Sequence, residues 1–186
     1  MTVTTLGWPT HILTGALSQR ELVDETVSHI LQEYNLEQPP GDINSENIFD
    51  DPKLKPFKEQ IVEPAFDEWL KNVGKSIYDY PNRSMRAWIT GTGYDYTIMT
   101  HNHSGAHLSA VFYLFNDSPG RGGELVLFDP RANANRAYKS DWNDYFGPMK
   151  IRTPSYTFAV FPSFVYHQTT PFKGKLRLAI PVDLFI

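Results

Sequence analysis

Cysteine is absent from this chain of 186 residues. Disulfides, zinc–thiolate sites and cysteine nucleophiles are therefore excluded, and any bound metal must use His, Asp or Glu ligands. The sequence also has no apolar run near the roughly 20 residues that a membrane-spanning helix needs. Its first residues lack the charged and apolar regions of a signal peptide, so we expect a cytoplasmic protein with no membrane partner.

The chain also carries little net charge. A formal charge of −4 provides no basic field for nucleic acid, and we expect no nucleic-acid partner. Hydrophobic residues make up 41% and aromatic residues 14% of the chain, which is enough for a substantial core. The length fits a single domain over residues 1–186, with a helical part in residues 1–80 and a strand-rich core in residues 84–184.

The helical part contains two amphipathic segments. The pattern S-Q-R-E at residues 18–21 is a capping box that predicts a helix start, and apolar residues recur at helical spacing over residues 22–34. A second helix is predicted over residues 57–73, with Gly74 as its stop. Pro64 lies inside this second helix and should kink or split it.

The remainder alternates short β-branched and aromatic runs with Gly, Pro, Asn and Asp breaks. About eight short strands suit a double-sheet jelly roll, with the two helices covering one sheet from outside. The polar stretch 131–147 is either a lid or binding loop, or a surface insertion. The predicted strands span residues 85–89, 94–100, 108–115, 124–128, 150–153, 157–161, 164–168 and 176–184.

Three histidines form a candidate metal site. His101 and His103 are the ends of an H-N-H triplet that follows a predicted strand, and residues at i and i+2 of a strand point to one face. His167 ends another predicted strand and could supply a third ligand. Three protein ligands with open positions are typical of a catalytic metal, while surface or turn histidines are the alternative. The other three histidines stand alone, and we interpret them as ordinary.

Arg177 is a lone cation within an apolar strand. Unpaired buried charge is costly, so this side chain needs a partner. A carboxylate ligand held by the guanidinium fork is one solution, and a salt bridge with Glu124 or Asp183 is another. Tyr113 and Ser109 share one face of a neighbouring strand, where either hydroxyl could help to bind that carboxylate. Plain core packing is the alternative for Tyr113.

Five motifs follow one another through the second half of the chain. They are the segment from Tyr96 through H-N-H, then L-S-A-V-F-Y-L, G-G-E-L-V-L-F-D-P, F-P-S-F-V-Y-H and the R-L-A-I strand. In this order they resemble the iron(II)- and 2-oxoglutarate-dependent dioxygenases, most closely the prolyl-hydroxylase-like branch with its small bacterial and phage members. The resemblance covers roughly residues 84–184. It implies a mainly β fold with some α, a double-stranded β-helix (jelly roll) with N-terminal helices packed on the larger sheet.

The resemblance also implies roles for single residues. His101 would be the first Fe(II) ligand and His167 the last. Arg177 would bind the distal carboxylate of 2-oxoglutarate, with Tyr113 hydrogen-bonded to the same group. His103 departs from the family's usual triplet, H-x-D or H-x-E, and an imidazole does not lower the charge of the iron site as a carboxylate does. His103 either ligates the iron, which we favour, or leaves a position open, or marks a zinc or otherwise altered site.

The function that the resemblance implies is an Fe(II)- and 2-oxoglutarate-dependent oxygenase. It would use O2, release succinate and CO2, and hydroxylate a peptide, prolyl or small-molecule substrate that the sequence does not identify. Two other functions stay open. One is a cupin-like three-histidine metalloenzyme that does not use 2-oxoglutarate, and the other is a non-catalytic jelly-roll binding module.

Overall fold

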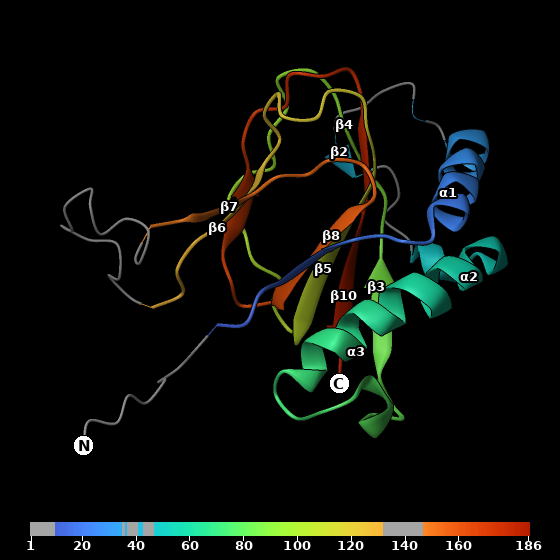
Figure 1. The fold of residues 1–186 in the computed structure, drawn as a ribbon, viewed down its shortest axis with the longest axis vertical. Coiled ribbons are helices and arrows are strands. Elements are labelled where there is room, and N and C mark those ends of the chain that lie inside the picture. The colour runs from blue at the N-terminus through green and yellow to red at the C-terminus, as the bar shows by residue number, and fades with distance from the viewer. Residues whose placement is uncertain (1–9, 35, 37–40, 43–46, 132–146) are drawn as a thin grey trace.

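Two antiparallel sheets form the body of the protein. The computed structural model describes residues 10–34, 36, 41–42, 47–131 and 147–186. Figure 1 shows the minor sheet and the helices on opposite sides of the major sheet. The minor sheet has the order β7 (Met149–Ile151), β6 (Leu125–Leu127) and β9 (His167–Thr169). The major sheet has the order β1 (Leu13–Ala16), β8 (Thr157–Pro162), β5 (Leu108–Asn116), β10 (Arg177–Phe185), β4 (Thr90–Thr92) and β2 (Gly41–Asp42), and β3 (Ser84–Ala87) also pairs with β10.

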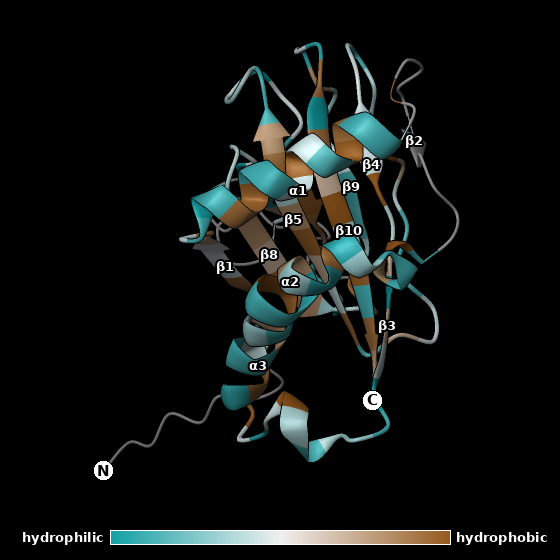
Figure 2. Ribbon diagram, turned by 90° about the vertical axis from the view of Figure 1, so that its right-hand side faces the viewer, coloured by the Kyte–Doolittle hydropathy of each residue, from teal (hydrophilic) through white to brown (hydrophobic). Residues whose placement is uncertain are grey.

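The helices cover the outer face of the major sheet, with their apolar sides toward it (Figure 2). They are α1 (Arg20–Glu33), α2 (Lys55–Phe57), a π-helical segment η3 (Lys58–Val62) and α3 (Glu63–Lys71). Three 3-10 turns accompany them: η1 (Ile48–Asp50), η2 (Pro52–Leu54) and η4 (Ile77–Asp79). None of the helices described here is long and apolar enough to cross a membrane.

The two central strands separate two cores by alternation, and their pairing is interrupted by one bulge between Leu178 and Ala179. Even-numbered residues of β5 and β10, such as Phe112 and Ile180, are buried against the helices. Odd-numbered residues, such as Tyr113 and Ala179, face the minor sheet. Because successive side chains of a strand point to opposite faces, each strand contributes its even-numbered residues to one core and its odd-numbered residues to the other. The predicted mainly β architecture, with helices on the larger sheet, is confirmed.

The second predicted helix runs over residues 55–71 without a break, and Pro64 coincides with a change of helix type rather than with a split. Pro64 has no N–H to bond the preceding turn, and the chain passes from the π-helical segment η3 into α3 at Glu63, with the proline in the first turn of α3. Gly74 is the predicted stop: its φ is +70°, and the N–H of Lys75 donates to the Leu70 carbonyl at 3.0 Å. This 6→1 bond is a Schellman ending, which requires a left-handed residue at Gly74.

The predicted capping box at residues 18–21 is wrong. Helix α1 begins at Arg20, and its N-cap is Gln19, which makes no side-chain capping bond. Glu21 is then one position too early in the helix to reach back to the N-cap amide. A capping box forms instead at η4, where Ser76 accepts from the amide of Tyr78 and Asp79 accepts from the amide of Ser76.

The strand predicted over residues 94–100 is also wrong. Asp95 adopts a left-handed φ of +64°, and the segment runs irregularly beside β9. The strand predicted over residues 164–168 begins only at His167, since a turn closes with the Val165 amide donating to the Pro162 carbonyl at 3.0 Å. Strands β1, β2 and β4 were not predicted. The long polar stretch 131–147 lies outside the described residues except at its two ends.

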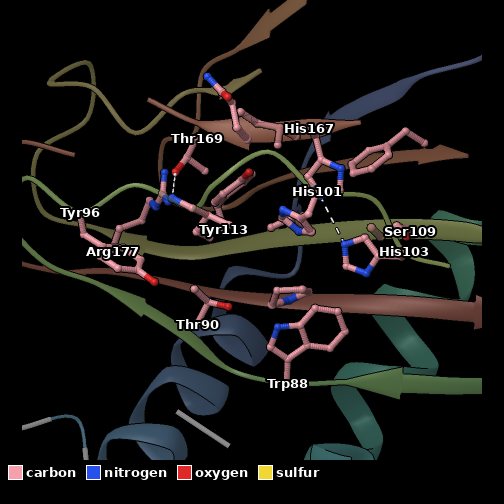
Figure 3. Close-up of a pocket in the computed structure, with 17 residues that line it drawn as sticks. Trp88, Thr90, Tyr96, His101, His103, Ser109, Tyr113, His167, Thr169 and Arg177 are labelled. Carbon is pink, nitrogen blue, oxygen red and sulfur yellow. Dashed lines mark hydrogen bonds between the residues drawn. The ribbon is translucent and has the colours of Figure 1, made fainter. Parts of the chain in front are cut away.

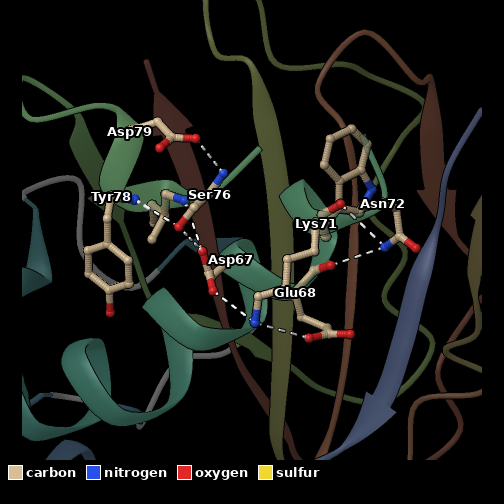
Figure 4. A network of polar contacts seen from close by, with 9 residues as sticks. Asp67, Glu68, Lys71, Asn72, Ser76, Tyr78 and Asp79 are labelled. Atoms are coloured by element: carbon tan, nitrogen blue, oxygen red, sulfur yellow. Dashed lines mark hydrogen bonds and ion pairs between the residues drawn. The ribbon is translucent and has the colours of Figure 1, made fainter. Parts of the chain in front are cut away.

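A polar network ties the end of α3 to η4 (Figure 4). Asp67 accepts from the Ser76 hydroxyl at 2.6 Å and from the Ile77 amide at 3.0 Å, and it pairs with Lys71 at 3.1 Å. The Ser76 hydrogen bond, followed by the Ile77 amide and Lys71, holds the pKa of Asp67 below its usual value against the effect of burial. The ionised carboxylate therefore stabilises the folded chain at neutral pH.

We expect Asp67→Asn to lower the free energy of unfolding by about 1 kcal/mol at pH 7, because charge-assisted hydrogen bonds become neutral ones. The stabilisation is present above the ordinary pKa of 3.8 and is lost as pH falls through the lowered pKa. The difference between variant and native protein should therefore shrink in denaturant titrations as pH is lowered below 3.8. Glu68→Gln is the matched control, since Glu68 is exposed and, among the described residues, its carboxylate forms an ion pair with Lys71 alone; an equal loss there would contradict the assignment.

Candidate metal centre

A pocket of about 340 Å³ opens between the two sheets. The odd-numbered residues of β5 and β10 form its floor, and β9 with the segment leading to His101 forms the opposite wall (Figure 3). Its lining is mostly apolar, including Ile98, Leu125 and Phe161. Three histidines lie in this pocket together with Arg177.

The three predicted histidines lie together because backbone bonds fix their segments. His101 and His167 form an isolated antiparallel bridge, with N–H···O distances of 2.9 and 2.8 Å between the two residues. The amide of His103 donates to the carbonyl of Ser163 at 3.1 Å. As a result, one ring nitrogen from each histidine lies within 4.8 Å of the others. No other group of three possible ligand residues occurs in the described part of the chain.

The ring protons of two histidines are fixed by backbone carbonyls. The Nδ1 atom of His101 lies 2.7 Å from the Met99 carbonyl oxygen, and that of His167 lies 3.0 Å from the Val165 carbonyl oxygen. A carbonyl oxygen only accepts, so each Nδ1 carries the proton and each Nε2 presents a lone pair. This is the arrangement that metal-binding histidines use.

His103 is held differently. Its Nδ1 atom lies 2.9 Å from Oδ2 of Asp183, and its ring stacks on Trp88 with centroids 5.5 Å apart. Its Nε2 atom lies 3.3 Å from Nε2 of His167. Two imidazole nitrogens that share a metal ion at about 2.1 Å are about 3.0–3.4 Å apart at ligand angles of roughly 90–110°. The observed spacing therefore fits two ligands of one metal ion.

His167 is the most buried of the three, with 4% of its surface exposed. Burial, with a smaller contribution from His101 and His103, lowers the pKa of His167 to about 4. The ring is therefore neutral at physiological pH. A neutral imidazole is the form that binds a metal ion.

Arg177 lies in the same pocket as a buried cation without an acidic partner. Only 2% of its surface is exposed, and burial lowers the pKa of its guanidinium. Nη1 donates to the Gly123 carbonyl oxygen and lies 3.4 Å from the Thr153 hydroxyl. Within the ranges that the structure describes, no Asp or Glu forms an ion pair with it. The salt bridges considered with Glu124 and Asp183 are not formed.

Aromatic rings and a glycine shape the space around this cation. The guanidinium carbon lies 5.6 Å from the ring centroids of both Tyr113 and Phe172. Gly123 has a φ of +76°, and a Cβ there would lie 2.6 Å from Nη1 of Arg177, so only glycine fits. Burial raises the pKa of Tyr113 to about 12, against the opposing effect of Arg177. The phenol is therefore neutral and able to donate a hydrogen bond beside the cation.

Ser109 lies at the other end of the pocket from Arg177. Its hydroxyl donates to Oδ1 of Asp183 at 2.7 Å and lies 3.0 Å from the Ser163 hydroxyl. In the β5–β10 register Ser109 pairs with Asp183, six positions from Arg177, which is about 20 Å along the strand. The structure therefore associates Ser109 with the histidines, and only Tyr113 with Arg177.

Sequence reasoning did not associate Asp183 with the histidines. Asp183 is three alternations from Arg177, so the strand period alone places both side chains on one face. His103 and Asp183 are 80 positions apart in the chain, so no local sequence pattern indicates their contact. The remaining histidines lie elsewhere: His29 binds Asp51, and His11 packs on Trp69.

Comparisons with known proteins agree with this geometry. A family model described as 2OG-Fe(II) oxygenase matches residues 86–183, which is over half of the chain. No curated protein matches the sequence. Among solved structures, a 2OG-Fe(II) oxygenase family oxidoreductase from Burkholderia pseudomallei has a TM-score of 0.52 at 14% identity, over 72% of this chain and 56% of the other. The present chain thus spans little more than half the length of that protein.

Two other structures cover nearly the whole chain. A prolyl hydroxylase from Trichoplax adhaerens, in complex with a hypoxia-inducible-factor peptide fragment, has a TM-score of 0.62 at 14% identity, over 95% of this chain and 83% of the other. HygX from Streptomyces hygroscopicus, with nickel, 2-oxoglutarate and hygromycin B bound, has a TM-score of 0.65 at 11% identity, over 95% and 83%. At these identities the likeness shows the fold, which confirms the expected jelly roll.

The family match covers both the histidine triplet and the strand that carries Arg177. It confirms the resemblance to the iron(II)- and 2-oxoglutarate-dependent oxygenases that the order of motifs indicated. The chain therefore belongs to the 2OG-Fe(II) oxygenase family and is a 2-oxoglutarate-dependent dioxygenase.

Proposed function

We propose that His101, His103 and His167 bind Fe(II), and that Arg177 with Tyr113 binds the distal carboxylate of 2-oxoglutarate. The protein then hydroxylates a peptide, prolyl or small-molecule substrate with release of succinate and CO2. One observation carries this proposal: three imidazole nitrogens face the same pocket as the buried guanidinium of Arg177, which forms no ion pair with a described Asp or Glu.

The histidines fit a divalent metal ion by chemistry as well as by spacing. Two of the Nε2 atoms, on His103 and His167, are only 3.3 Å apart. If both carry lone pairs they repel each other, and a shared cation turns that repulsion into two bonds. Imidazole is a good ligand for iron, zinc and copper, and the family indicates iron.

Arg177 fits one end of a dicarboxylate. A planar guanidinium matches a carboxylate with two parallel hydrogen bonds, and the neutral Tyr113 hydroxyl can add a third donor. Burial strengthens these bonds, because little water competes for them. The Gly123 carbonyl and the flanking rings hold the fork in place before any ligand arrives.

The remaining pocket walls exclude water and orient the substrate. When bound, iron with 2-oxoglutarate and O2 supplies the oxidising chemistry of the family. Ile98, Val111 and Leu125 provide a dry surface beside the metal site. Trp88 keeps the His103 ring from rotating through its stacking contact.

The class of substrate follows from the relatives and from the pocket. One similar structure holds a peptide fragment and another holds hygromycin B. The pocket of about 340 Å³ has room for a co-substrate and for one side chain or a small group, but not for a whole folded partner. We therefore propose that the substrate presents a single small uncharged group to the metal, in keeping with the apolar walls.

Removal of one histidine tests the metal site. We expect His167→Ala to weaken Fe(II) binding by more than the roughly 10–100-fold that follows loss of an outer partner of a ligand. Anaerobic calorimetry on the metal-free protein measures the change. His107→Ala is the matched control, because His107 is exposed and lies outside the cluster. Unchanged Fe(II) affinity in His167→Ala would contradict the assignment.

Removal of the buried cation tests the co-substrate site. We expect Arg177→Ala to weaken 2-oxoglutarate binding to the metal-loaded protein by about 10–100-fold, since charged hydrogen bonds contribute about 1.5–3 kcal/mol. The 2-oxoglutarate affinity of Arg177→Lys should fall between those of the native protein and Arg177→Ala, because lysine keeps the positive charge but cannot form two parallel hydrogen bonds to a carboxylate. Fe(II) affinity should survive in both variants.

The matched control for this test is Arg152→Ala, which removes the same charge from an exposed position. Equal 2-oxoglutarate affinity in Arg177→Ala and native protein would make Arg177 structural. Fe(II) binding without any 2-oxoglutarate binding in the native protein would favour the three-histidine metalloenzyme that does not use 2-oxoglutarate.

A further inference from the structure

His103 is set apart from the other two histidines by the partner of its Nδ1 atom. His101 and His167 each bond a backbone carbonyl two residues earlier in the chain. His103 bonds the Asp183 carboxylate instead, at 2.9 Å, across the sheet and 80 positions along the chain. A carbonyl orients a ring, whereas a carboxylate both orients it and adds negative charge.

Asp183 is itself held in place and has few other partners. Only 8% of its surface is exposed, and its Oδ1 atom accepts from the Ser109 hydroxyl at 2.7 Å. Ser109 is its direct cross-strand neighbour on β5, so the sheet register fixes this contact. Among the described residues, no Lys or Arg forms an ion pair with Asp183; its one ion-pair partner is His103.

Burying a carboxylate is costly unless positive charge lies nearby, and Arg86 on β3 is the cross-strand neighbour of Asp183. The cost is offset further if a positive charge also lies on the far side of the His103 ring. A metal ion bound at Nε2 provides that charge, because the imidazole transmits it to Nδ1–H and so strengthens the bond to Oδ2. Before 2-oxoglutarate binds, three neutral imidazoles alone would leave the full charge of a divalent ion uncompensated in the pocket.

We propose that Asp183, anchored by Ser109, is a positioning residue that supplies the metal centre with its negative charge through His103. The inference rests on the proposed function, in which His103 is a ligand. The chain thus carries its carboxylate one shell further out than a directly ligating Asp or Glu at position 103 would place it. Ser109 fixes the carboxylate, the carboxylate fixes the ring, and the ring presents Nε2 to the metal.

The test compares metal affinity in two aspartate variants. Asp183→Asn keeps the shape and an acceptor oxygen for His103, and the Ser109 hydroxyl can turn from donor to acceptor, so only the charge is lost. We expect this variant to bind Co(II) about 10–100-fold more weakly in anaerobic titrations of the metal-free protein. Asp51→Asn is the matched control, since Asp51 is also a part-buried aspartate bonded to a histidine, at 2.6 Å, on the helical side of the sheet. It removes the same charge and should leave Co(II) affinity unchanged.

A second variant and a spectroscopic measurement remain informative if Asp183→Asn folds poorly. Ser109→Ala leaves the carboxylate in place but removes its anchor, and we expect a smaller loss of Co(II) affinity in the same direction. In zinc-loaded native protein, long-range proton–nitrogen NMR spectra should show the His103 proton on Nδ1. A proton on Nε2 of His103 would overturn the proposal whatever the variants do, because that nitrogen could not then ligate.

The outcomes separate this proposal from the proposed function. Equal Co(II) affinity in native protein, Asp183→Asn and Ser109→Ala overturns the role of Asp183 and leaves the metal site standing. Absence of metal binding in the native protein overturns both. An equal loss in Asp51→Asn and Asp183→Asn would show a general charge effect and would also overturn the role of Asp183.

Discussion

The pairing of β10 with β5 is the constraint on which the site depends. These two nine-residue strands lie side by side at the centre of the major sheet, and their register sets which residues meet. One face of the pair is apolar and packs against the helices. The other face carries Arg177 and Asp183 on β10, with Tyr113 and Ser109 on β5. A slip of one residue in either strand would turn that strand's two site side chains into the helical core, so apolar burial on one face fixes the polar chemistry on the other.

The minor sheet completes the site through local backbone bonds rather than long strands. The bridge between His101 and His167 joins the irregular segment after β4 to the start of β9. Both rings then take their orientation from carbonyls in their own segments. Short segments are enough to orient these rings, because a hydrogen bond at Nδ1 fixes the direction in which Nε2 points. The metal site thus lies between a rigid floor and a wall that its own hydrogen bonds arrange.

The features that the sequence predicted well are those with a local physical cause. Pro64 disturbs the regular α-helical bonding because the missing N–H acts within one turn, and Gly74 stops the helix because the left-handed conformation is local. The predicted capping box was wrong because the helix N-cap lies one residue later than predicted, and sequence signals locate a helix end only to within a residue or two. The face of Arg177 was predictable from a period of two. The contact between Asp183 and His103 was not, because it depends on the fold bringing distant segments together.

The charges of the pocket explain why these residues belong together. On the proposed assignment, Arg177 would pair with the distal carboxylate of 2-oxoglutarate, while the divalent iron would be compensated by the second carboxylate and, through His103, by Asp183. A buried cluster near neutrality avoids most of the desolvation cost that a net charge would carry. A carboxylate ligand at position 103 would satisfy the same count, but Asp183 behind it would then add a second, uncompensated anion. His103 and Asp183 therefore depend on each other, and a substitution at either position changes the charge that the other contributes to the metal site.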